Sequence, residues 1–411
     1  MLPSPIQLYK KAYSGLSRNS WYLCLVMFIN RSGTMVVPFM AIYCNKVLHF
    51  SLQQSGYIMG IFGAGSILGA LVGGKITDRY GFYYMQISAL LMGGLLFFLV
   101  GLQTSFFALA ICCFIQSFFN ESFRPANSTA IAYYSNDENR TRSYSLNRLA
   151  VNLGWAFGGF LGGTLAGINY HLLFWVDGST NILAALLLLK LIPASKVVQS
   201  IKKNIQPVRE SAYRDGIYLI FIALAILFAS CFFQLFSMQS LFYKTQWHFS
   251  EQFIGTLMAV NGLLIVCFEM VIIHRLEGKR HQLQYIPIGV VLTGAGFVLL
   301  NFLPAAYYAS FVVIIFITLG EIMAMPFMNS FWITRTTPGN RGEYAALYTI
   351  AWSIAQIFGP VAGALIAAHW GYYPLWWSVG IVCFLAAFGF RLLYHYTAKK
   401  KTVVPLEETV F

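Results

Sequence analysis

Charge is scarce in this sequence. Of its 411 residues, only 10% are charged and 58% are apolar, whereas an average soluble domain has roughly 45–50% apolar and about 25% charged residues. No stretch between the apolar segments is long enough for an independent water-soluble domain. The composition therefore excludes a soluble globular protein and an enzyme or receptor domain carried on a loop, and it indicates a membrane protein.

The motifs of nucleotide, metal and hydrolase chemistry are missing as well. The sequence contains no GxxxxGK[ST], no HExxH and no GxSxG, which are the common signatures of phosphate binding, zinc hydrolysis and serine nucleophiles. Its seven cysteines include no CxxC pair and lie mostly in apolar runs, where Cys behaves as a small apolar residue. We expect no enzyme activity, no metal site and no cofactor.

A cleavable signal peptide is not evident. Residues 1–20 are basic and polar and lead directly into a full-length apolar stretch, unlike the short apolar core of a secretory signal. We therefore expect the N-terminus to stay in the cytoplasm.

What the sequence does contain is a series of apolar stretches of membrane-spanning length. A helix needs about 20 apolar residues to cross the hydrocarbon core, and twelve such stretches are present. The sequence therefore predicts an all-α membrane protein with twelve transmembrane helices. They start near Trp21, Ser55, Tyr83, Phe106, Ser145, Leu172, Ile217, Phe253, Leu283, Ala309, Tyr344 and Pro374.

The basic residues predict the orientation of these helices. With both termini inside, 22 of the 27 Lys and Arg residues fall on the cytoplasmic side, two fall outside, and Arg31, Arg124 and Arg148 lie within spans. This asymmetry follows the positive-inside rule. The net charge of +13 thus reflects topology, and we expect a multi-pass protein of a bacterial inner membrane or plasma membrane that binds no nucleic acid.

The chain divides into two similar halves. A shift of 201 positions aligns Pro125 with Pro326, Arg140 with Arg341 and Gly158 with Gly359, and a shift of 199 aligns Gly56 with Gly255. Duplicated halves are typical of transporters that move two bundles around a central site. We predict two pseudo-symmetric six-helix bundles at 1–192 and 216–396, a basic cytoplasmic linker at 193–215 and a cytoplasmic tail at 397–411.

Two glycine-containing motifs link the sequence to a family. Gly74-Lys75-Ile76-Thr77-Asp78-Arg79-Tyr80-Gly81 resembles the GxxxD(R/K)xG loop of the major facilitator superfamily, and Gly154 to Gly163 resembles the GxxxGPxxGG element of its proton-coupled drug antiporters, with Gly159 in place of the Pro. The resemblance implies two bundles that rock about a cavity lined by helices 1, 4, 7 and 10.

The same motifs supply the predicted gating residues. Glycines four apart lie on one helix face and let helices approach closely, while a carboxylate in a tight turn can cap the N-terminus of a facing helix. The resemblance implies that helix 11 is the partner of this carboxylate. The predicted gating residues are Gly74, Asp78, Arg79, Gly81, Gly154, Gly158 and Gly162.

Ionisable residues within spans are functional candidates because they are costly to bury in lipid. Glu321 lies near the middle of its helix with no basic residue one turn away, so it could exchange a proton near neutral pH. Glu269 is the second candidate for proton coupling and Glu121 the third, the latter one helical turn from Arg124 and within possible reach of Arg31. Asp177 falls near the outer end of its helix, where we expect water nearby and an interfacial structural role.

The resemblance places a set of polar and aromatic residues in the central cavity as substrate ligands: Arg31, Asn30, Glu121, Arg124, Phe233, Gln234 and Glu321. We expect a monomeric, proton-coupled secondary transporter for small amphipathic molecules, most similar to drug and metabolite efflux antiporters. A proton-driven importer of peptides or other zwitterions is the close alternative. A multispan membrane sensor and a membrane-embedded transferase are alternatives from other classes.

Overall fold

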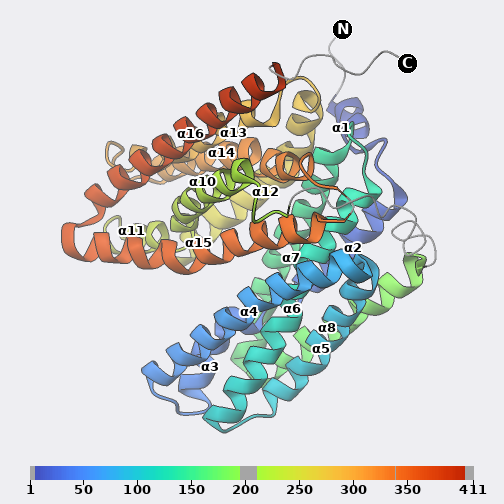
Figure 1. Ribbon diagram of the computed structural model, residues 1–411. Helices are drawn as coiled ribbons and strands as arrows, with labels where there is room; N and C mark the ends of the chain where they lie inside the picture. Colours follow the sequence, from blue (N-terminus) through green and yellow to red (C-terminus); the bar gives the residue numbers. More distant parts are fainter. Residues whose placement is uncertain (1–4, 195–210, 338, 403–411) are drawn as a thin grey trace. The chain divides into compact units, whose positions relative to one another are not determined.

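The computed structural model describes residues 5–194, 211–337 and 339–402, and every regular element among them is a helix. Figure 1 labels these helices. Their bounds are α1 (Pro5–Tyr13), α2 (Arg18–Ser32), α3 (Val36–Lys46), α4 (Leu52–Tyr80), α5 (Phe82–Gly101), α6 (Phe106–Tyr134), α7 (Arg140–Ile168), α8 (His171–Leu191), α10 (Gly216–Phe232), the 3-10 turn η1 (Phe233–Leu235), α11 (Met238–Thr245), α12 (Glu251–Leu276), α13 (Gln282–Leu299), α14 (Tyr307–Ile333), α15 (Arg341–Trp370) and α16 (Tyr372–Thr402).

The predicted all-α membrane architecture is confirmed. Within the described ranges, eleven helices are long and apolar enough to cross a membrane, and each begins within five residues of a predicted span. The remaining predicted span, from Trp21, is divided between α2 and α3, neither of which reaches membrane length alone. Large apolar side chains such as Phe107, Phe160 and Trp370 are more than 70% exposed, as expected for surfaces that face lipid.

The same turn follows the first span and the seventh. His49-Phe50-Ser51 and His248-Phe249-Ser250 are identical tripeptides separated by 199 positions. Both histidines have positive φ, 57° and 54°, and both serines cap the next helix by accepting a hydrogen bond from the backbone N–H three residues on. The internal repeat thus extends to individual backbone angles.

The described residues form two compact units. The first holds residues up to Ser211 together with Ile333–Ser353. In it α4, α5, α6 and α8 run side by side, with neighbouring pairs α4 with α6, α5 with α6 and α5 with α8. Helix α2 lies against both α7 and α8, so it is held from two sides.

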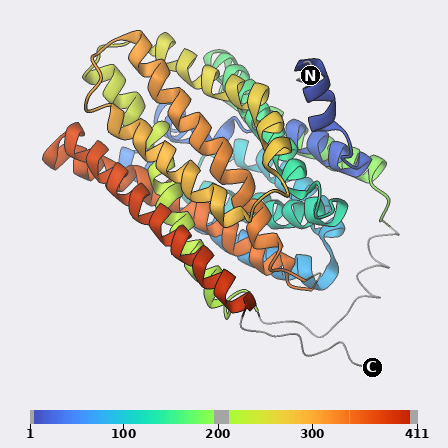
Figure 2. The same cartoon turned by 90° about the horizontal axis from the view of Figure 1, so that it is seen from above.

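The second unit holds Ala212–Trp332 and the residues from Ile354. Here α16 lies along both α13 and α10, and Figure 2 shows the red α16 beside the yellow-green α10. These pairs correspond to α8 with α5 and α2 in the first unit. The two halves therefore repeat each other in helix packing as well as in sequence.

The predicted domain boundaries follow the order of the chain, and they stay a prediction. Most of the predicted linker, residues 195–210, and residues 403–411 of the predicted tail lie outside the described residues. The compact units differ from the predicted bundles in one respect, because the first turns of α15, from Arg341 to Ser353, belong to the first unit.

Candidate functional site

The first predicted span is broken near its middle. Helix α2 ends at Ser32 and α3 begins at Val36, and Gly33, Thr34 and Met35 lie between them. Pro38 has no backbone N–H and cannot donate to the carbonyl four residues earlier, so a helix that continued from α2 would lose one hydrogen bond there. In the first turn of α3 this missing donor costs nothing, because N–H groups there have no intrahelical partner. The local sequence is therefore compatible with the break, although α6, α13, α14 and α15 each continue through an internal proline.

Asp177 of α8 holds the second part of this broken helix. Its carboxylate accepts hydrogen bonds from the backbone nitrogen of Met35, at 3.1 and 3.2 Å, and of Val36, at 2.9 Å. Asp177 lies near the start of α8, as expected, but it is 1% exposed, so the expectation of nearby water is wrong. A negative side chain at a helix N-terminus satisfies unpaired N–H groups and the helix dipole together. Asp177 thus caps α3 from inside the first unit.

Two further contacts fix the break against α8. The Asn30 side chain donates to Oδ1 of Asn181 at 2.9 Å, and the Asn181 amide donates to the backbone carbonyl of Asp177 at 2.8 Å. A Cβ added to Gly33 would overlap the Thr180 side chain. Asn30, predicted as a substrate ligand, is therefore 5% exposed and bound to a neighbouring helix.

Arg31 lies directly before the break, near Glu121 and Arg124 of α6. Glu121 and Arg124 form a salt bridge at 3.1 Å, and Arg31 interacts electrostatically with both. Among the described residues, the Arg31 guanidinium has no carboxylate within 4.0 Å, so the pairing of Arg31 with Glu121 that the sequence left open is not formed. The three predicted ligands are thus neighbours, with one more positive than negative charge.

The seventh predicted span is broken at the matching place. Helix α10 ends at Phe232, the 3-10 turn η1 includes Phe233 and Gln234, and α11 begins at Met238. Gln234 is 4% exposed and donates from Nε2 to the carbonyl oxygens of Ser230, at 3.2 Å, and Gly359, at 2.7 Å. The shift of 199 that aligns the turns after these two spans places Gly33 on Phe232, the last residue of α10. Both halves therefore interrupt their first helix at equivalent positions.

Glu321 lies in the middle of α14 in the second unit and is 4% exposed. Asn261 of α12 donates from Nδ2 to Glu321 Oε2 at 3.2 Å and to Thr318 Oγ1 at 2.8 Å. The Thr318 hydroxyl already donates to the Ile314 carbonyl at 2.6 Å, so it can only accept from the amide. This fixes the Asn261 amide with its N–H groups toward Glu321.

Glu269, the second predicted proton carrier, is 2% exposed on α12. It lies two helical turns beyond Asn261 on the same helix. Gln234 makes its hydrogen bonds to α10 and α15, whereas Glu321 accepts a hydrogen bond from α12.

The predicted glycine face of α7 packs on the broken helix. A Cβ at Gly154 would lie 2.6 Å from Arg31 Cβ, one at Gly158 would lie 3.0 Å from the Ser32 carbonyl oxygen, and one at Gly162 would lie 3.2 Å from Met35 Cβ. Gly159 and Gly163 have nothing within 4 Å of an added Cβ. The face of α7 that carries Gly154, Gly158 and Gly162 thus allows close approach and contacts the segment that carries Arg31, whereas the equally spaced Gly159, Gly163 and Gly167 face open space.

Asp78 caps the first turn of α15. Its Oδ1 lies 2.6 Å from the Gly342 nitrogen and its Oδ2 lies 2.8 Å from the Glu343 nitrogen. Gly74 packs against the same turn, where an added Cβ would lie 2.6 Å from Ala346 Cβ. Helix α15 is the eleventh predicted span, so the capping contact that the resemblance implies is present. A gating role for this contact stays a prediction.

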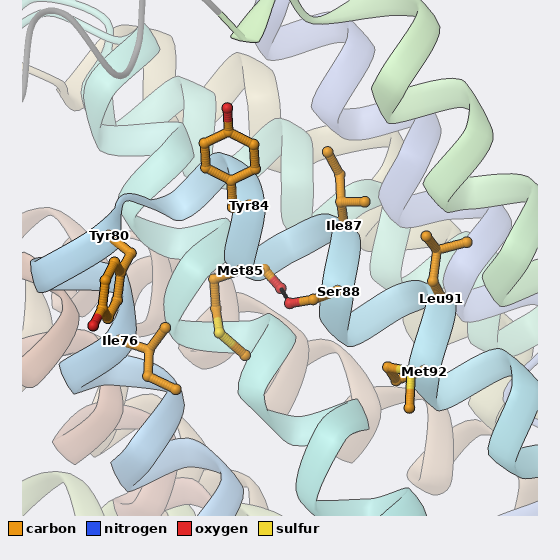
Figure 3. A pocket seen from close by; sticks show the side chains of 8 residues that line it. All are labelled: Ile76, Tyr80, Tyr84, Met85, Ile87, Ser88, Leu91 and Met92. Carbon is orange, nitrogen blue, oxygen red and sulfur yellow. Dashed lines mark hydrogen bonds between the residues drawn. The ribbon is translucent and has the colours of Figure 1, made fainter.

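The two other predicted gating residues lie at the junction of α4 and α5. Gly81 has φ 93°, a left-handed conformation that Gly adopts without steric cost. The Arg79 guanidinium lies over the Tyr80 ring at 5.3 Å from its centroid. Figure 3 shows a groove beside this junction that is lined by Ile76, Tyr80, Tyr84, Met85, Ile87, Ser88, Leu91 and Met92. The groove is almost entirely apolar and includes none of the predicted substrate ligands.

In the part of the chain that the structure describes, no group of three or more His, Cys, Asp or Glu side chains is arranged so that it could hold a metal ion. Sequence reasoning missed the capping role of Asp177 and the supporting roles of Asn261 and Asn181. Gly33 and Pro38 within a predicted span were the available signal for the break.

The sequence is similar to transporters along most of its length. Multidrug resistance protein 2 of Bacillus subtilis (strain 168) is 20% identical over 347 residues, which cover 83% of this chain and 86% of the relative. The Na(+), Li(+), K(+)/H(+) antiporter of Planococcus maritimus is 24% identical, and the match covers 91% of this chain and 95% of the relative.

Solved structures show the same fold at low identity. The human organic anion transporter MFSD10 (TETRAN) has a TM-score of 0.74 at 14% identity and covers 91% of this chain and 99% of its own. A bacterial homologue of the iron transporter ferroportin in an outward-facing state has a TM-score of 0.73 at 17% identity and covers 92% and 100%. The family model described as Major Facilitator Superfamily matches residues 23–355 and 330–410. With the duplicated helix packing and the two broken helices, this match across the chain shows that the protein belongs to the major facilitator superfamily, whose members are secondary transporters and not enzymes.

Proposed function

We propose that this secondary transporter couples the movement of small amphipathic molecules to protons, as an efflux antiporter that works by alternating access. The observation that carries the proposal is the buried carboxyl group of Glu321, which lies in the middle of a membrane-spanning helix and accepts a hydrogen bond from Asn261 at 3.2 Å. Ionisable groups at this depth are rarely present without a functional reason. The names of the multidrug and antiporter relatives agree with this choice.

Glu321 is the proposed main proton carrier. Oε2 accepts from the Asn261 amide, and a carboxyl oxygen can do so whether the group is ionised or neutral. Asn261 therefore holds the side chain in place through both protonation states. Glu269, equally buried on α12, is the proposed second carrier, and Glu121 is the third.

The proton gradient supplies sufficient energy without a cofactor. One proton that moves down 100 mV releases about 2.3 kcal/mol, and each pH unit adds about 1.4 kcal/mol. At roughly 1.4 kcal/mol per tenfold ratio of concentrations, these terms sustain a gradient of several hundredfold.

The proposed substrate ligands of the first unit are Arg31, Asn30, Glu121 and Arg124, and those of the second unit are Phe233, Gln234 and Glu321. Among these ligands, Arg31 places the strongest demand on its surroundings. Its guanidinium is charged at any physiological pH, so it needs an anion or water as a partner. In the cell, we propose a monomer in a bacterial inner membrane or plasma membrane with both termini in the cytoplasm.

For the gate, we propose that the Asp78 cap holds the start of α15 in one conformation and is released in the other. Asp78 accepts two charge-assisted hydrogen bonds from backbone N–H groups. Such bonds are stronger than neutral ones, so they can stabilise one conformation and still break once in each transport cycle. Gly74, Arg79 and Gly81 shape the turn that presents Asp78. Gly154, Gly158 and Gly162 let α7 slide against the broken first helix.

A specific observation keeps the importer of peptides or other zwitterions as the second candidate. Arg31 beside the Glu121–Arg124 salt bridge offers a cation for a substrate carboxylate and, after the salt bridge opens, a carboxylate for a substrate amine. The two candidates differ in the direction of uphill transport and in the charge of the substrate.

Flux measurements in proteoliposomes test the proposal. The wild type, Glu321→Gln, Glu269→Gln and Arg31→Ala are compared with cationic drugs and dipeptides, with the interior acidic in one series and the exterior acidic in the other. We expect drug exchange for protons in the wild type. In Glu321→Gln we expect loss of pH-driven accumulation and a smaller loss of drug-for-drug exchange, because Glu321 is also a proposed substrate ligand. Fully pH-driven uphill transport by Glu321→Gln would rule out Glu321 as the carrier, and dipeptide accumulation toward the alkaline side would favour the importer.

A further inference from the structure

Asp177 is a buried carboxylate that binds two backbone N–H groups at the start of α3. The side chain is 1% exposed, and both carboxylate oxygens are engaged, since Met35 donates to Oδ1 and Oδ2 and Val36 donates to Oδ2. These donors are the backbone N–H groups of the N-cap residue Met35 and of Val36, the first residue of α3, at the point where the first span is broken.

We propose that Asp177 is a proton-binding site whose occupancy controls the break between α2 and α3 and thereby the position of Arg31. This inference rests on the proposed coupling to protons and adds a second site to it, in the other half of the chain from Glu321.

The ionised form of Asp177 is balanced by the start of α3. Within the described residues no basic side chain lies within 4.0 Å of its carboxylate, so the positive partner is the N-terminal end of the helix. The elements that pack against α8 are α2, α3, α5 and α7. Their ionisable residues, with those of α8 itself, are Arg18, Tyr22, Cys24, Arg31, Tyr43, Cys44, Lys46, Tyr83, Tyr84, Arg140, Arg142, Tyr144, Arg148, His171 and Lys190.

Protonation weakens this cap for a simple chemical reason. A carboxylate has acceptor sites on both oxygens, whereas a neutral carboxyl group uses one oxygen as an O–H donor. After one proton from the aqueous phase binds to Oδ1 or Oδ2, the N–H groups of Met35 and Val36 compete for fewer acceptor sites. The first turn of α3 is then held less tightly, and loss of the proton restores it.

The loosening of α3 affects Arg31 through the backbone of the break and through the contact of Asn30 with α8. Thr34 donates its backbone N–H to the Arg31 carbonyl at 3.1 Å, and Met35 donates to the Gly33 carbonyl at 2.7 Å, so the break is one continuous turn from Arg31 to Met35. Asn30 and Asn181 join the end of α2 to the same turn of α8. A shift of α3 therefore changes the geometry at Arg31, which interacts with Glu121 and Arg124.

Hydrogen exchange of the backbone amides of Met35 and Val36 in the purified, reconstituted protein tests this inference. We expect the protection factors of the wild type, corrected for intrinsic exchange, to fall about tenfold on acidification, as expected for the loss of one charge-assisted hydrogen bond. Asp177→Asn, which cannot be ionised, should have low protection at every pH. Asp215→Asn, which alters the carboxylate cap of α10 at Tyr218, should leave the response of Met35 and Val36 as in the wild type.

Protection at Met35 and Val36 that is independent of pH in the wild type overturns the inference, and this readout needs no variant to fold. A variant Asp177→Asn that retains the wild-type pH response also overturns it. A wild type that loses protection in acid but does not couple protons to transport supports Asp177 as a proton-binding site while it overturns the proposed function. The experiments therefore distinguish failure of the Asp177 proposal from failure of the proposed proton-coupled transport.

Discussion

Asp78 binds the start of α15 at Gly342, with 2.6 Å between the Asp78 Oδ1 and the Gly342 nitrogen. The residues are 264 positions apart in the sequence, yet both belong to the first compact unit. A single carboxylate in the turn after a span thus holds the beginning of a helix whose later part, from Ile354, belongs to the second unit.

Removal of this carboxylate should affect stability and transport together. Asp78→Ala leaves the N–H groups of Gly342 and Glu343 without their acceptor, and loss of a cap costs about 0.5–2 kcal/mol. We expect a lower midpoint of thermal unfolding in detergent and transport reduced by at least about tenfold, which corresponds to roughly 1.4 kcal/mol. Asp78→Asn, which keeps one acceptor oxygen, should be intermediate.

The control for Asp78 is Ser250→Ala, which removes the cap of α12 at Phe253. It should lower thermal stability by a similar amount and leave transport largely intact. If Asp78→Ala loses no more transport than Ser250→Ala, the capping contact is structural and has no part in gating.

Gly342 should tolerate no side chain. An added Cβ would overlap the Gly74 carbonyl oxygen and lie 3.0 Å from Asp78 Cγ, and strain of this kind costs about 1–3 kcal/mol. We expect Gly342→Ala to lower stability and transport, measured as thermal unfolding and proteoliposome flux. Gly216→Ala, where an added Cβ has nothing within 4 Å, should behave as the wild type, and equal behaviour of the two variants would contradict the close packing of α4 and α15.

The glycines of α7 offer a matched comparison within one helix. Gly154→Val places a branched side chain where Cβ alone would already lie 2.6 Å from Arg31 Cβ, whereas Gly159→Val has open space. We expect Gly154→Val to reduce flux by at least about tenfold and Gly159→Val to retain most of it, since both share the helix and the change in propensity. Comparable flux in the two would show that the face of α7 toward Arg31 does not need glycine.

The helices are predictable from the sequence because each depends on the length of its own apolar stretch. Apolar length placed the starts of eleven spans to within five residues, and Gly154, Gly158 and Gly162 share one face of α7, the face that packs closely on the broken helix. The internal repeat predicts that a structural feature of one half recurs in the other. The breaks between α2 and α3 and between α10 and α11 are such a feature.

The contacts of Asp177, Asn261 and Asn181 were not predictable, since each depends on which helices become neighbours. Hydropathy placed Asp177 near a helix end and therefore near water, but the depth of a residue also depends on the helices around it, and α2 and α3 cover this one. The pairing of Asn261 with Glu321 joins residues 60 positions apart. No pattern within either helix records such a pairing.

The paired histidines give a prediction about backbone strain. His49 and His248 adopt φ of 57° and 54°, which costs a residue with a Cβ about 1–2 kcal/mol and costs a β-branched residue more. His248→Val should therefore lower the midpoint of thermal unfolding, and His49→Val should do the same because the turn is repeated. His248→Gly should stay within about 1 kcal/mol of the wild type, because relief of strain offsets the greater freedom of the unfolded chain. His395→Val, on the exposed side of α16, is the control for loss of the imidazole, and a drop there as large as at His248 would show that the ring and not the backbone angle matters.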